Sequence, residues 1–181
     1  STPFPYTTLF RSLDTEEISN LDVDESINLT DVLVIKAPAD AAADDEATIK
    51  VKVVSQANTS VYKTFTSRST VEQDFEPKIR IGGSDTQSAE PDDEVVYTLN
   101  LTNEGNGDDD ITLSLRGGNA TWGTLGESSF TLAAGATETV ELRVSAPKGT
   151  LAQNGYVITV RATSEDGVTT YDRNVFLNVQ Q

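Results

Sequence analysis

Hydrophobic and polar residues alternate in three stretches of the second half of the chain, residues 94–103, 139–144 and 156–163. A period of two places successive side chains on opposite faces of a β-strand. Each stretch therefore predicts a strand that buries one face. The inward positions of these strands are Val95, Tyr97, Leu99, Leu101, Val140, Leu142, Val144, Tyr156, Ile158, Val160 and Ala162.

Shorter strands and turn signals fill the gaps between these stretches. Strands are predicted at residues 78–81, 111–115, 130–132 and 171–179, and Glu165-Asp166-Gly167 is a hairpin signal. In the last strand either Val175 and its alternate neighbours or Phe176 and Asn174 could face inward. About seven short strands with turns every 8–12 residues predict an all-β fold, an immunoglobulin-like antiparallel β-sandwich.

An internal repeat divides the chain. Ala37-Pro38 recurs as Ala146-Pro147, an offset of 109 residues. Without gaps, this offset also places Leu33 on Leu142, Ile35 on Val144, Ile49 on Ile158, Val51 on Val160, Ser55 on Ser164 and Tyr62 on Tyr171.

The repeat predicts one complete domain, residues 78–181, preceded by residues 13–77, the C-terminal part of a truncated copy. The segment Phe75-Glu76-Pro77 would be the joint. A partial sandwich leaves sheet edges and an apolar face open. We therefore expect the truncated copy to be poorly packed unless its missing strands are supplied.

The first twelve residues differ from the rest. Residues 2–12 resemble the translation of a short-read sequencing adapter, Thr-Leu-Phe-Pro-Tyr-Thr-Thr-Leu-Phe-Arg-Ser, with Pro3 in place of leucine. We interpret residues 1–12 as a non-native segment; the alternative is a genuine extended strand. The chain begins with Ser and has no secretory leader, so it is expected to be an internal piece of a longer protein.

The complete copy resembles a known family of modules. Its pattern of turns and core residues is similar to NEW3-type domains, with the related CARDB cell-adhesion domains close behind. The chain departs from this pattern at Asp92-Asp93, where the family favours glycine. The resemblance implies an accessory, repeated module of secreted or cell-surface proteins, sometimes attached to glycoside hydrolases or proteases. The matching positions are Pro91, Glu94, Asn103, Gly105, Trp122, Leu132, Gly135, Ala146 and Pro147.

Composition narrows the functional classes. The net charge is −16, with no cluster of Lys or Arg, which argues against nucleic-acid binding. The chain has no Cys and no His, so it lacks disulfides, a catalytic thiol and the usual general base. No apolar run is long enough to span a membrane. We therefore expect this chain to have no enzymatic activity.

Two acidic clusters are candidate calcium sites, and calcium is the one cofactor considered. Asp108, Asp109 and Asp110 could supply oxygen ligands, although EF-hand spacing is absent. The second cluster comprises Asp40, Asp44, Asp45 and Glu46. The alternative for both is a solvated turn. The carboxylates of residues 90–94 sit on one turn rather than across a cleft, which argues against glycosidase chemistry.

Surface chemistry supplies the remaining candidates. Asn28, Asn58, Asn100 and Asn119 are in glycosylation sequons, which matter only if the protein is exported. Trp122, with Tyr97 or Tyr156, could stack on a sugar; the alternative is a core position.

Two functions follow from this reading. The first is a structural or adhesive spacer in an extracellular or cell-surface protein, whose partners are neighbouring domains of the same polypeptide and cell-surface glycans or proteins. The alternative is a carbohydrate-binding accessory module of an extracellular hydrolase. An exposed aromatic patch would favour the alternative.

Overall fold

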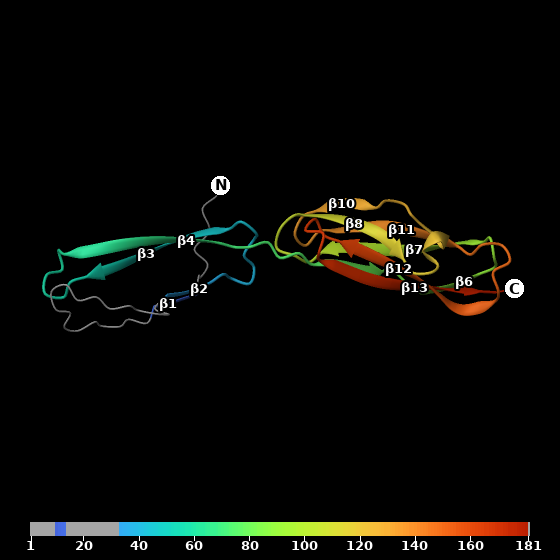
Figure 1. The fold of residues 1–181 in the computed structure, drawn as a ribbon, viewed down its shortest axis with the longest axis horizontal. Helices are drawn as coiled ribbons and strands as arrows, with labels where there is room; N and C mark the ends of the chain where they lie inside the picture. Colours follow the sequence, from blue (N-terminus) through green and yellow to red (C-terminus); the bar gives the residue numbers. More distant parts are fainter. Residues whose placement is uncertain (1–9, 14–32, 181) are drawn as a thin grey trace. The chain divides into compact units, whose positions relative to one another are not determined.

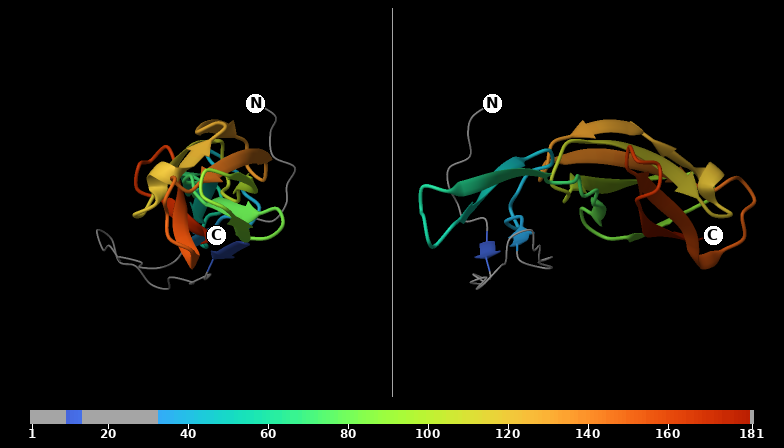
Figure 2. Two further views of the ribbon diagram at one scale, coloured as in Figure 1. Left: turned by 90° about the vertical axis from the view of Figure 1, so that its right-hand side faces the viewer. Right: turned by 60° about the vertical axis from the view of Figure 1, so that its left-hand side comes forward.

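The computed structural model describes residues 10–13 and 33–180. The chain divides into two compact units, Ser1–Val71 and Glu72–Gln181. Figure 1 labels the strands of each unit, and Figure 2 shows the same ribbon from two further sides. The units are described separately below.

The second unit is a two-layered β-sandwich. One sheet has the strand order β10-β8-β12-β13-β6 and the other has the order β5-β7-β11-β9. Neighbouring strands are antiparallel except β6 and β13, which are parallel. The strands are β5 (Pro77–Ile81), β6 (Thr86–Ala89), β7 (Glu94–Asn103), β8 (Asp109–Arg116), β9 (Gly123–Leu125), β10 (Ser129–Leu132), β11 (Thr137–Ser145), β12 (Gln153–Thr163) and β13 (Thr170–Val179), with a short 3-10 turn η1 (Ala120–Trp122) before β9.

The core lies between the two sheets, and its residues follow the predicted alternation. On β7, Tyr97, Leu99 and Leu101 are all buried, and the Tyr97 hydroxyl donates to the Phe176 carbonyl of the other sheet at 2.7 Å. The all-β fold predicted from the sequence is confirmed. The buried core comprises Ile79, Tyr97, Leu99, Leu101, Ile111, Leu113, Leu132, Val140, Leu142, Val144, Ala146, Ile158, Val160, Ala162, Val175, Leu177 and Val179.

The phase of the last strand, left open by the sequence, is settled by the structure. Val175, Leu177 and Val179 face the core, whereas Phe176 is only partly buried. Arg173 lies on the core-facing side near the sheet edge, and its Nη2 is 3.7 Å from Asp85 Oδ2. The strand therefore carries its apolar set inward, and Arg173 interrupts that set between Tyr171 and Val175.

The described part of the first unit consists of two two-stranded sheets. β1 (Phe10–Leu13) pairs with β2 (Leu33–Lys36), and β3 (Glu46–Val54) pairs with β4 (Tyr62–Thr70). Residues 10–12 of the adapter-like segment thus form part of a strand, and residues 1–9 lie outside the described residues.

The β3–β4 hairpin reproduces the β12–β13 hairpin with one extra residue in its loop. Ser55 N donates to Val61 O, whereas Ser164 N donates to Thr169 O. Ser55 therefore matches Ser164 as predicted. Beyond the loop the offset falls by one, so Tyr62 matches Thr170 rather than Tyr171. The ungapped alignment was wrong on this last strand because a loop accepts an insertion that a paired strand does not.

The first unit buries few apolar side chains. Among its described residues only Ala41 and Ile49 belong to the buried apolar set. Val53 is 53% exposed and Phe65 is 58% exposed. Both lie on the hairpin face that carries Ile49, because Phe65 pairs with Val51 and side chains alternate along each strand. This face is the counterpart of the one that β12 buries, which supports the expected poor packing of the truncated copy.

Candidate functional site

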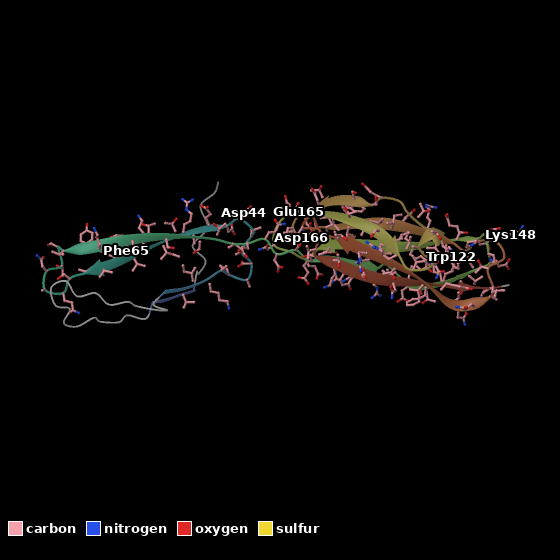
Figure 3. All side chains as sticks on the ribbon, in the orientation of Figure 1. Asp44, Phe65, Trp122, Lys148, Glu165 and Asp166 are labelled. Carbon is pink, nitrogen blue, oxygen red and sulfur yellow. The ribbon has the colours of Figure 1, made fainter. Side chains whose placement is uncertain are left out.

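The candidate residues of the second unit lie at its two ends. Figure 3 labels Trp122 near one end and Glu165 and Asp166 near the other. Asp109 belongs to the second of these ends, because its Oδ1 accepts a hydrogen bond from Glu165 N at 3.0 Å. The acidic and the aromatic candidates therefore do not form one site.

The carboxylates of the acidic run point in different directions. Asp109 is 1% exposed on the inner face of β8, whereas Asp110 is exposed on the outer face and accepts from Thr131 Oγ1 at 2.6 Å. Asp108 is exposed. Throughout residues 10–13 and 33–180, no group of three or more His, Cys, Asp or Glu side chains is placed to hold a metal ion. The predicted calcium site at residues 108–110, and the one around Asp44, thus gain no support from the geometry.

The carboxylates of residues 90–94 form a turn. Asp93 N donates to Glu90 O at 3.2 Å, and Asp92 has a positive φ of 71°. Pro91 stands at the position where proline is favoured in a turn whose next residue has positive φ. Glycine adopts this conformation more readily than aspartate does. Glu94 binds Arg143 at 2.9 Å, so the cluster has a structural role.

The sequons differ in how free their amides are. Asn119 Nδ2 donates to Val157 O at 3.1 Å, and this nitrogen is the atom that a glycan would occupy. Asn100 is half-buried, and its Oδ1 accepts from Thr139 Oγ1 at 3.2 Å. Asn58 is exposed in the β3–β4 loop, and Asn28 lies outside the described residues. Asn58 is the most accessible described sequon.

Trp122 packs against the core rather than presenting a flat platform. It is half-buried, and its ring centroid is 4.9 Å from that of Tyr156 with the planes tilted by 53°. Tyr97 is 1% exposed and cannot contact a ligand. The exposed large apolar residues of the second unit, within the described part of the chain, are aliphatic: Val96, Leu151 and Val168.

The shifted titrating groups have structural causes. Hydrogen bonds from Thr169 and Val168 lower the pKa of Asp166, and the hydrogen bond from Arg161 lowers the pKa of Asp172. Burial raises the pKa of Tyr97 to about 12. These groups belong to a turn, a cross-strand ion pair and the core, so none forms an acid–base pair at a cleft.

Two shallow depressions mark the outer surface of the five-stranded sheet, and both are polar. One surrounds Asp172 and Asn174, and the other surrounds Asp110 and Thr131. Arg161 binds Asp172 through two contacts of 2.7 Å beside the first depression. The carboxylate of Asp172 is thus already engaged.

Asn103 holds the loop that follows β7. Its side chain is 0% exposed, and its Nδ2 donates to Gly107 O at 2.8 Å and to Leu132 O at 2.9 Å. Its Oδ1 accepts from Gly105 N at 2.9 Å. The sequence marked Asn103 and Gly105 as motif positions but gave no signal that the amide is fully buried.

Residues 90–178 match a family model described as "IG-like fold at C-terminal of FixG, putative oxidoreductase". The second unit is an immunoglobulin-like domain. The match covers slightly less than half of the chain and leaves out the first unit. It bears out the immunoglobulin-like fold and shows neither the NEW3 nor the CARDB type.

Several solved structures resemble the chain. A FixG-related protein from Vibrio parahaemolyticus has a TM-score of 0.45 at 13% identity, covering 59% of this chain and 97% of that one. A family 123 glycoside hydrolase from Clostridium perfringens also has a TM-score of 0.45, at 12% identity, covering 59% of this chain and 28% of the hydrolase. The major pilin subunit of Bacillus cereus has a TM-score of 0.41 at 12% identity, covering 74% of this chain and 48% of the pilin.

No curated protein matches the sequence. Within the described residues, no helix has the length and apolar character needed to cross a membrane.

Proposed function

We propose that this chain is a non-catalytic structural module, of the NEW3 or CARDB type, within a larger secreted or cell-surface protein. It acts as a spacer or adhesive bead, and its partners are the neighbouring domains of the same polypeptide. The net charge of −16 keeps such beads soluble and apart.

The observation that carries this proposal is the placement of the aromatic residues in the second unit. Tyr97 is in the core, and Trp122 and Tyr156 pack on each other at a steep angle. A carbohydrate-binding surface would present flat, exposed rings. The surface of the second unit is instead polar, with scattered aliphatic side chains, which is normal for a protein surface.

A glycan array on the full chain, run with and without calcium, tests the proposal. We expect no reproducible binding. Binding to a defined polysaccharide that is lost in Trp122→Ala, with the circular dichroism spectrum retained, would support the carbohydrate-binding alternative. Leu151→Ala is the matched control, because Leu151 is an exposed apolar residue near Tyr156, whose hydroxyl donates to the Leu151 carbonyl at 3.1 Å.

A further inference from the structure

The segment that leads into the second unit lies against one loop of that unit. We call residues 72–76 the lead-in segment and residues 104–108 the docking loop. Asn106 N donates to Asp74 O at 3.2 Å, and Asp74 N donates back to Asn106 Oδ1 at 2.7 Å. Asn106 Nδ2 also donates to Glu72 O at 3.0 Å. One asparagine thus contacts three backbone groups of the lead-in segment, as a neighbouring strand would.

Two further hydrogen bonds flank this asparagine. Glu104 N donates to Glu76 O at 2.8 Å, and Gln73 Nε2 donates to Asp108 O at 2.6 Å. Only the Gln73 bond uses a side chain of the lead-in segment. The docking loop therefore recognises an extended backbone rather than a particular sequence.

The docking loop is built for close approach. A Cβ on Gly105 would collide with the Asp74 carbonyl oxygen and would lie 3.2 Å from Glu76 N. Gly105 is thus required because the lead-in segment lies against it. Asn103 fixes the shape of the loop from inside, through its buried amide.

The first unit holds the residue immediately before the lead-in segment. Val71 N donates to Asp45 O at 2.8 Å, and Asp44 N donates to Val71 O at 2.9 Å. Glu72, the next residue, is held by Asn106. The backbone contacts of the first unit thus reach Val71, and those of the second unit begin at Glu72.

We propose that residues 104–108 form a docking site for extended polypeptide, and that its occupant is the lead-in segment. Docking holds residues 72–76 against the second unit as part of that unit rather than as free chain. These residues include Phe75 and Glu76 of the predicted joint. This inference goes beyond the spacer function and is independent of it, since a docked lead-in segment is compatible with a glycan-binding module.

Amide hydrogen exchange on the full chain tests the proposal. In the wild type, the Asp74 amide is expected to exchange at a slow, protected rate. Asn106→Ala should speed its exchange by at least about tenfold, the factor expected for loss of a hydrogen bond, while the Leu99 amide in the core keeps its rate. Asp108→Ala is the matched control in the same loop, because only the carbonyl of Asp108 contacts the lead-in segment.

A second variant and a second readout keep the test decisive if Asn106→Ala alters the loop. Gly105→Ala should also release Asp74, because its added methyl group occupies the place of the Asp74 carbonyl. A protease that cleaves after glutamate should cut after Glu72 faster in both variants than in Asp108→Ala. An unprotected Asp74 amide in the wild type, or protection that survives both substitutions, would overturn the proposal.

Discussion

The Asn103→Ala substitution tests how much stability of the second unit depends on one buried amide. The Asn103 side chain is fully buried and makes three hydrogen bonds, to the Gly107 carbonyl, the Leu132 carbonyl and the Gly105 amide. Alanine removes the partner of all three groups.

The size of the effect follows from these three groups. Leaving a buried donor or acceptor without a partner costs about 1–3 kcal/mol. Gly107 and Gly105 are only partly buried, so water replaces part of what they lose. We therefore expect the free energy of unfolding to fall by about 3–5 kcal/mol, which lowers the melting temperature by roughly 12–20 °C for a unit of this size.

The assay is urea unfolding of the full chain, followed by tryptophan fluorescence. Trp122 is the only tryptophan and packs against the core of the second unit, so its signal reports that unit alone. Asn100→Ala is the control on the same strand, where the half-buried side chain has one hydrogen bond to Thr139, and should cost less than about 1 kcal/mol. Equal stability losses for Asn103→Ala and Asn100→Ala would refute the reasoning.

Two further predictions concern pH and calcium. Burial raises the pKa of Tyr97 from 10.0 to about 12. As the pH rises from 10 to 12, the Tyr97 hydroxyl therefore loses its proton in the unfolded chain before it does so in the folded one, and the free energy of unfolding falls. Tyr97→Phe should lose less stability over that interval in the same fluorescence assay; an identical loss would contradict this. Millimolar calcium should leave the melting temperature unchanged, because Asp109 and Asp110 face opposite sides of β8. A rise of several degrees would contradict this prediction and indicate that calcium binds.

The alternating pattern of the sequence correctly predicts the strands that bury one face and expose a polar one. β7 and β12 follow this rule, and their inward residues Leu99, Leu101, Ile158 and Val160 are all buried as predicted. Period-two patterning carries this information because a shift of one residue would move the whole apolar set into water.

The sequence could not predict elements whose pairing is decided by partners far along the chain. β6, Thr86–Ala89, is polar and short, and only its parallel pairing with β13 makes it a strand. β13 has apolar residues in both phases, so Val175 and Phe176 could not be ranked before the sheet was known. The direction of each carboxylate in the acidic run was hidden for the same reason, because Asp109 and Asp110 belong to a strand rather than to a loop.

The docking contacts were also hidden from the sequence. In the sequence alone, Asn106 and Gly105 are typical turn residues. Their second role depends on residues 72–76, which lie about thirty positions earlier and form no alternating pattern of their own.

The parallel strand β6 has a consequence for self-association. It pairs with residues 176–179, the last four of the ten residues of β13, whose backbone groups would otherwise be free to pair with another chain. In the part of the first unit that the structure describes, the counterpart strand β4 pairs with β3 alone. A β-strand from a second molecule could pair with the edge of β4 as β6 pairs with the end of β13.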